Sequence, residues 1–265
     1  MLTVKSADGT SIAYDKTGEG PAVVLVAGAF SYRKFPMLQK LAAELSTRFT
    51  VYNYDRRGRG DSGDNQPYDV QREIEDLQAV VDVAGGTANV WGLSSGAILS
   101  LRAAAAGVPM NKLALYDPPF RVDASAPLPP ADFAVRLQEL VAADKRGEAV
   151  KYMMTKGMGA PGFAIAIMRL LPVWKNLTGL AHTLPYDTAV LGSAANGRPL
   201  VAEEWEPVKV PTLAIAGGKA PAAIQTGTKA LVDVLPDATY KVLPGQSHNV
   251  SAKALAPVLS EFFVQ

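Results

Sequence analysis

Short runs of apolar residues recur along the first 117 residues, each about as long as a β-strand. The run at residues 22–28 is unbroken, which is typical of a strand buried on both faces of a sheet. Segments with helical spacing of their apolar residues lie between the runs, near residues 36–47, 70–81 and 95–106. The pattern predicts a parallel sheet covered by helices. The predicted strands are "AVVLVAG" (22–28), "FTVYNYD" (49–55), "ANVWGL" (88–93) and "KLALYD" (112–117).

The two ends of the chain extend this pattern. "LTVKS" and "SIAYDK" flank the turn signal Ala7-Asp8-Gly9 and predict a β-hairpin. The strand–helix alternation stops after Asp117 and resumes with "PTLAIAG" (211–217), a helix, "ATYKVLP" (238–244) and a last amphipathic helix. We therefore expect an α/β core made of residues 1–118 and 207–265.

The segment between these blocks, residues 119–206, has helical periodicity and Pro/Gly punctuation. An insertion after a sheet strand is most simply a helical lid over the strand ends, where α/β sheets bind ligands. Its flexible apolar side chains could line a substrate pocket, or they could simply pack the lid helices onto the sheet. The residues proposed for substrate binding are Met153, Met154, Met158, Met168 and Trp174.

Composition narrows the class of partner. The chain has 265 residues with 26 basic and 25 acidic side chains, a net charge of +1. Such a balance favours a small-molecule substrate over nucleic acid or a membrane surface. There is no cysteine, which excludes a thiolate nucleophile. The N-terminus resembles no signal peptide, so we expect a cytoplasmic protein, and no pattern fixes its oligomeric state.

The stretch Gly92-Leu93-Ser94-Ser95-Gly96 matches G-x-S-x-G. A predicted strand precedes it and a predicted helix follows it, as a nucleophile elbow requires. The sharp strand-to-helix turn strains the serine backbone and leaves no room for flanking side chains, which explains the glycines. Ser94 is then the nucleophile; a chance match in a chain with 23 glycines is the alternative.

A serine hydroxyl needs a base to take its proton, and the chain has two histidines. His182 lies in the lid segment "GLAHTL", where a surface or packing role is expected. His248 lies in "LPGQSHNV", between the last predicted strand and the last helix. We therefore predict His248 as the general base.

The third member of a triad orients the imidazole and follows the serine in the chain. The loop after "PTLAIAG" contains no carboxylate, and Asp233 and Asp237 come too late in the sequence. Asp117 ends the strand "KLALYD" and can reach the same histidine from a neighbouring strand end. We assign Asp117 as the acid; the alternative is a cap of the turn before Pro118.

A tetrahedral oxyanion needs two backbone N–H donors, each worth about a hundred- to a thousandfold in rate. One comes from the residue after the nucleophile, here Ser95. The other comes from the loop after "AVVLVAG", where Ala29 is the first candidate and Phe30 the second.

The elbow, the histidine loop and the order of the strands together resemble the α/β-hydrolase superfamily over nearly the whole chain outside the lid. "GEGPAVVLVAG" resembles the strand leading to that family's oxyanion loop, and "YDRRGRGDSG" (54–63) resembles its D-x-R-G-x-G-x-S turn, which is structural there. Two features depart from the common pattern. Ala27-Gly28 stands where many members have His-Gly, and the acid at Asp117 has the placement known from haloalkane dehalogenases.

The resemblance implies an α/β-hydrolase fold with a helical lid inserted after the sixth strand. It also implies acyl transfer by Ser94 and His248 on a small to medium, largely apolar ester, lactone or thioester, with no cofactor or metal. A serine nucleophile argues against dehalogenase and epoxide hydrolase chemistry, which needs a carboxylate. Two alternatives stay open: another triad enzyme, such as a carbon–carbon bond hydrolase, perhydrolase, lyase or cyclase, and a non-catalytic small-molecule binder.

Overall fold

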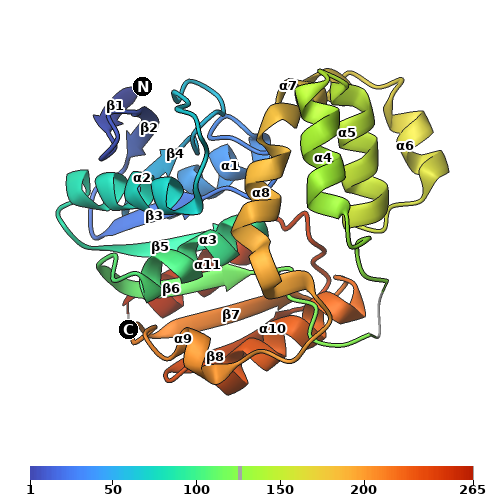
Figure 1. Cartoon of the computed structure of the whole chain (residues 1–265). Helices are drawn as coiled ribbons and strands as arrows, with labels where there is room; N and C mark the ends of the chain where they lie inside the picture. The colour runs from blue at the N-terminus through green and yellow to red at the C-terminus, as the bar shows by residue number, and fades with distance from the viewer. Residues whose placement is uncertain (125–126, 265) are drawn as a thin grey trace.

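An eight-stranded sheet crosses the molecule within residues 1–124 and 127–264, the part of the chain that the computed structural model describes (Figure 1). The strand order is β1-β2-β4-β3-β5-β6-β7-β8. The strands are β1 (Leu2–Lys5), β2 (Ser11–Thr17), β3 (Ala22–Val26), β4 (Thr50–Tyr54), β5 (Ala88–Leu93), β6 (Met110–Tyr116), β7 (Thr212–Gly217) and β8 (Ala238–Leu243).

The directions of the strands agree with the sequence pattern. β1 and β2 form the predicted antiparallel hairpin, and β2 also runs antiparallel to β4. From β4 to β8 all neighbouring strands are parallel. β5 and β7 are buried along their whole length, as expected of apolar runs covered on both faces. The predicted mostly parallel sheet is confirmed.

Helices cover both faces of the sheet. Successive side chains of β3 alternate between two apolar cores: Val24 and Val26 join one, and Val23 and Leu25 join the other. The first core takes side chains from α2 (Val70–Val83), α3 (Ser95–Ala105) and α10 (Ala222–Val234). The second takes them from α1 (Pro36–Leu45) and α11 (Ala252–Val264).

The predicted insertion follows β6, the sixth strand, and its described residues are helical or irregular. Most of its helices gather beside the sheet around a third apolar core. Helix α8 lies between α4 of this group and the sheet helices α2 and α3 (Figure 1). Trp205 at the end of the segment packs into the first core. The helices are α4 (Phe133–Ala142), α5 (Arg146–Tyr152), α6 (Gly162–Met168), α7 (Val173–Gly179), α8 (Leu184–Leu191) and α9 (Ala202–Trp205).

No helix among the described residues combines the length needed to cross a membrane with sufficient apolar character.

Candidate active site

Ser94 lies at the turn between β5 and α3, at the carboxyl end of the sheet. Its φ is 55° and its ψ is −124°, a conformation that side-chain-bearing residues rarely adopt. The Ser94 N–H donates to the carbonyl of Tyr116 on the neighbouring strand β6 at 3.0 Å, and this hydrogen bond holds the turn. The backbone at Ser94 therefore has the sharp strand-to-helix turn expected from the motif.

The two glycines of the motif stand where the chain passes close to itself. A Cβ on Gly92 would lie 2.6 Å from the carbonyl oxygen of Gly96 and 2.7 Å from the Cα of Ala97. A Cβ on Gly96 would meet the carbonyl oxygens of Val26 and Ala27. These neighbours are backbone atoms, so they cannot move aside cheaply.

We expect Gly92→Ala to destabilise the protein by about 1–3 kcal/mol, since overpacking a filled core costs that much. Thermal unfolding should show a Tm several degrees lower. Gly147→Ala is the matched control, because a Cβ there meets nothing nearer than 3.6 Å in the first turn of α5. A Gly92→Ala protein as stable as the control would contradict the steric role.

Asp117 and His248 are brought together from two parts of the chain. Asp117 follows β6 directly, and its Oδ2 lies 3.1 Å from His248 Nδ1. The other carboxylate oxygen accepts the Gly217 N–H at 2.8 Å. Asp117 is fully buried, whereas 49% of the His248 side chain is exposed. A buried carboxylate thus orients the imidazole through Nδ1 and leaves Nε2 outside this contact, which is the arrangement of a catalytic triad.

Neighbouring strand ends hold the histidine loop in place. Tyr116 Oη donates to the Ser247 carbonyl at 2.8 Å, and the Lys219 N–H donates to the Gln246 carbonyl at 2.7 Å. Burial and the nearby Asp117 charge raise the pKa of Tyr116, so its phenol stays protonated and remains a donor. His248 is therefore fixed by contacts on both sides, from β6 and from the loop after β7.

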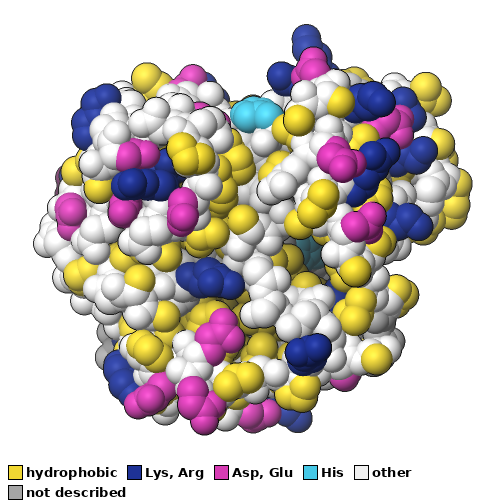
Figure 2. Space-filling model, in the orientation of Figure 1, with side chains coloured by type: hydrophobic (Ala, Val, Ile, Leu, Met, Phe, Trp, Pro, Cys, Tyr) yellow, Lys and Arg dark blue, Asp and Glu magenta, His cyan; other side chains and the backbone are white. Residues whose placement is uncertain are grey.

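Ser94 and His248, the predicted nucleophile and base, make no direct contact with each other in this structure. Among the described residues, Ser94 Oγ forms no hydrogen bond with His248 or with another protein group. Such contacts often form only when substrate is bound. Figure 2 shows the surface hollowed between α8 and α4, with part of a histidine side chain visible in the hollow.

The oxyanion candidates lie beside Ser94. Ser95 is the first residue of α3, so its N–H has no acceptor within the helix. Gly28 touches the elbow, because a Cβ on it would lie 3.0 Å from Ser94 Cβ. Ala29 and Phe30, which follow, are half-buried, and Phe30 has a φ of 57°. The loop after β3 and the start of α3 therefore meet at Ser94.

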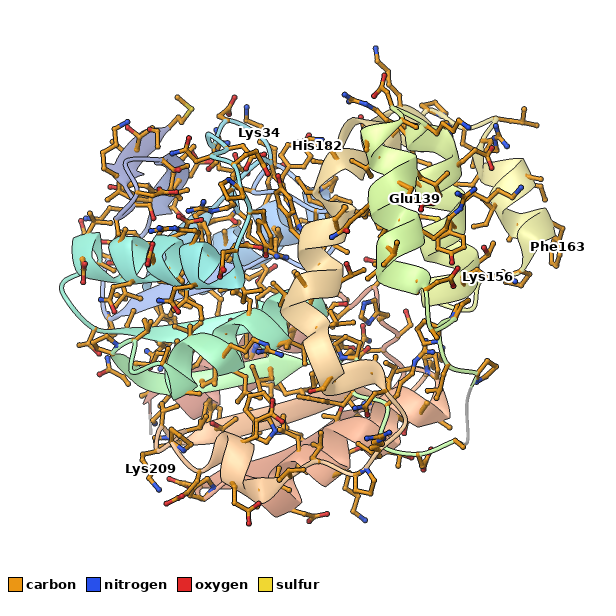
Figure 3. All side chains as sticks on the ribbon, in the orientation of Figure 1. Lys34, Glu139, Lys156, Phe163, His182 and Lys209 are labelled. Atoms are coloured by element: carbon orange, nitrogen blue, oxygen red, sulfur yellow. The ribbon has the colours of Figure 1, made fainter. Side chains whose placement is uncertain are left out.

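The five proposed substrate-binding residues occupy three different environments. Met153 is buried in the third core, and Met154, Met168 and Trp174 pack partly buried against it. Ala29 and Phe30 of the oxyanion loop border the same core. Met158 is 48% exposed. The exposed side of this segment continues on α6, where Phe163 points away from the molecule (Figure 3).

The remaining sequence candidates lie elsewhere. His182 (labelled in Figure 3) donates from Nε2 to the Gly58 carbonyl at 2.7 Å, and so joins the inserted segment to the core. Asp233 is exposed near the end of α10. Asp237 precedes β8, at the opposite end of that strand from His248. The structure does not bring these two carboxylates to the histidine loop.

A buried ionic cluster lies beside Ser95 and the loop after β3, and it was not predicted from the sequence. Arg56, Arg59, Glu73 and Asp187 are each at most 2% exposed. Burial by itself would raise the pKa of Asp187, but Arg59 and Arg56 hold it below its usual value. The available signal was the density of arginines in "DRRGRGD" together with a lone acid in the apolar helix "LPYDTAVL", because buried charges must be paired.

Comparison with known proteins shows the family of this chain. A family model described as the alpha/beta hydrolase family matches residues 23–259, and the chain belongs to that family. An alpha/beta hydrolase from Sphaerobacter thermophilus DSM 20745 is 49% identical, with a TM-score of 0.92 over 99% of this chain and 100% of that one. The superfamily and the α/β-hydrolase fold predicted from the sequence are confirmed.

More distant solved structures share the fold. An esterase from Rhodococcus sp. ECU1013 is 19% identical, with a TM-score of 0.70 over 100% of this chain and 98% of that one. A meta-cleavage product hydrolase from Pseudomonas fluorescens IP01 is 14% identical, with a TM-score of 0.68 over 100% and 97%. A search of curated protein sequences gave no significant match. Family membership supports hydrolase activity on a small molecule.

Proposed function

We propose that this protein is a serine hydrolase that cleaves a small to medium, largely apolar carboxylic ester, lactone or thioester through an acyl-enzyme. One observation carries the proposal. Ser94 stands on a strained elbow after β5, and the hydrogen-bonded pair Asp117 and His248 follows β6 and β8 at the same edge of the sheet.

Each group has a role in the proposed reaction. Ser94 Oγ attacks the carbonyl carbon while His248 Nε2 takes its proton, and Asp117 stabilises the imidazolium. The N–H groups of Ser95 and of Ala29 or Phe30 receive the oxyanion. His248 then protonates the leaving group, and afterwards it activates water to release the acid.

The surroundings of the oxyanion loop support an apolar substrate. Ala29 and Phe30 pack against the third core of apolar side chains, which the inserted helices supply. Half-buried apolar groups beside the reacting carbon favour a hydrocarbon acyl chain over a charged one. The inserted segment is accordingly proposed as the lid that selects substrate.

Labelling with a fluorophosphonate, followed by peptide mapping, tests the nucleophile. We expect the label at Ser94 because only an activated serine reacts readily with the phosphorus centre. Labelling without ester turnover would shift the assignment to another reaction of the same triad. No labelling at all would favour a binding protein.

A series of p-nitrophenyl esters tests the substrate class. We expect kcat/KM to rise about fourfold per added methylene until the pocket is filled, since each buried CH₂ contributes about 0.8 kcal/mol. A terminal carboxylate on the acyl chain should lower kcat/KM by at least about tenfold, because its charge must be desolvated. A preference for the charged ester would overturn the apolar assignment.

A further inference from the structure

The buried ionic cluster connects the inserted segment to the oxyanion loop. Asp187 on α8 accepts from Arg59 Nη2 with both carboxylate oxygens at 2.8 Å, and from Arg56 Nη1 at 2.8 Å. Arg56 also binds Glu73 in a bidentate pair at 2.6 and 2.7 Å. All four side chains are at most 2% exposed. Such a cluster holds its members rigidly, because moving one would leave an unpaired buried charge.

Both arginines donate to the oxyanion loop as well. Arg59 Nη1 donates to the Gly28 carbonyl at 2.6 Å and to the Ser31 carbonyl at 3.3 Å. Arg56 Nη1 donates to the Ala27 carbonyl at 3.3 Å. The arginines therefore fix where the carbonyl groups on the inner side of this loop point.

Fixing the Gly28 carbonyl also fixes a candidate oxyanion donor. The carbonyl of Gly28 and the N–H of Ala29 belong to one peptide group, and in a planar trans peptide these two bonds point in opposite directions. Since Arg59 holds the Gly28 oxygen on the buried side, the Ala29 N–H faces away from the cluster. The charged donor on the carbonyl also polarises the peptide, which strengthens the N–H as a donor.

The second candidate donor is tied to the same carboxylate. Ser95, whose N–H follows the nucleophile, donates from Oγ to Asp187 Oδ1 at 2.7 Å. Arg56 Nη1 lies 3.3 Å from the same hydroxyl. One carboxylate on α8 thus links the loop after β3 to the first residue of α3.

We propose that Asp187 is a positioning residue for the oxyanion hole: through Arg59 and Ser95 it sets the directions of the two N–H donors. This proposal rests on the proposed function, because it assigns a role to donors that act in acyl transfer. Since Asp187 belongs to the inserted segment, the seating of α8 on the core is coupled to the electrostatics at the reacting carbon.

Two variants test the proposal in the 265-residue chain. Asp187→Asn removes the charge that pairs with Arg59 and that Arg56 contacts in addition to Glu73, and Ser95→Ala removes only the hydroxyl link while both arginines keep their contacts with Asp187. Ser100→Ala is the matched control: its buried hydroxyl, also on α3, donates to the Gly96 carbonyl at 2.8 Å, away from the cluster.

The measurements are kcat and KM for a p-nitrophenyl ester and the affinity for a trifluoromethyl ketone. Addition of Ser94 Oγ to that ketone gives a tetrahedral hemiketal whose oxygen lies in the hole. We expect kcat to fall about a hundredfold in Asp187→Asn and about tenfold in Ser95→Ala, with KM within about twofold, because a misaligned donor keeps only part of its effect. The ketone affinity should fall in parallel, and Ser100→Ala should match the wild type.

Each possible result supports or overturns the positioning role of Asp187. If Asp187→Asn does not fold, Ser95→Ala alone is decisive. A folded variant with kcat and ketone affinity within about twofold of the wild type overturns the positioning role, and so does a loss confined to KM or to thermal stability. If the wild type neither turns over esters nor reacts with the phosphonate at Ser94, the proposed function fails and this proposal fails with it.

Discussion

Replacing Ser94 with alanine is expected to lower ester turnover by about 10⁴-fold or more. The substitution removes the atom that forms the acyl bond in the proposed reaction, and the proposed oxyanion donors that remain accelerate attack by water only weakly. The fold should persist, because the backbone hydrogen bond from Ser94 to Tyr116 does not involve the side chain. The measurement is kcat for a p-nitrophenyl ester, with a check of Tm.

Ser247→Ala provides the control, since this exposed serine lies in the histidine loop and contributes its backbone carbonyl to Tyr116. Its activity should equal that of the wild type. A Ser94→Ala protein that kept more than about a tenth of the activity would show that another group is the nucleophile.

The sheet could be predicted because its strands are covered on both sides. β5 and β7 have no exposed residue, so each is mostly apolar in the sequence, with Asn89 and Thr212 as the polar exceptions. The hairpin of β1 and β2 could also be predicted, because the residues that form its turn are adjacent in the sequence. Local signals of this kind need no knowledge of the tertiary structure.

The pairing of Asp117 with His248 could be anticipated from topology. Both residues follow parallel strands of one sheet, and the carboxyl ends of such strands meet at one edge. The residues are 131 positions apart and still form the 3.1 Å contact. The contact is present in the structure, and its catalytic role stays a prediction.

The pairing of Arg59 with Asp187 could not be predicted in the same way. The two residues are 128 positions apart, and the acid lies on a helix of the inserted segment. Helical periodicity shows that a helix forms, but it does not show where the helix packs. For the same reason the sequence could not separate buried Met153 from exposed Met158.

The other large effect is expected from Asp117→Asn, which should lower kcat by about 10⁴-fold with little change in KM. The Gly217 N–H donates to Oδ1 of Asp117, and only the oxygen of an asparagine amide can accept it. The amide nitrogen would therefore face His248 Nδ1 and donate to it. That contact places the imidazole proton on Nε2, which then cannot take the proton of Ser94.

Two carboxylates away from the site provide the controls. Asp233 and Asp237 are exposed carboxylates remote from the histidine loop, so Asp233→Asn and Asp237→Asn should leave kcat within about twofold of the wild type. If Asp117→Asn instead kept a rate within about threefold of the wild type, the imidazole would be oriented by another group. If one of the two control variants lost the activity, that residue would be the acid. Because the substitution keeps the size of the side chain and its contact with Gly217, a loss of kcat at unchanged Tm reports the tautomer of His248 rather than the stability of the fold.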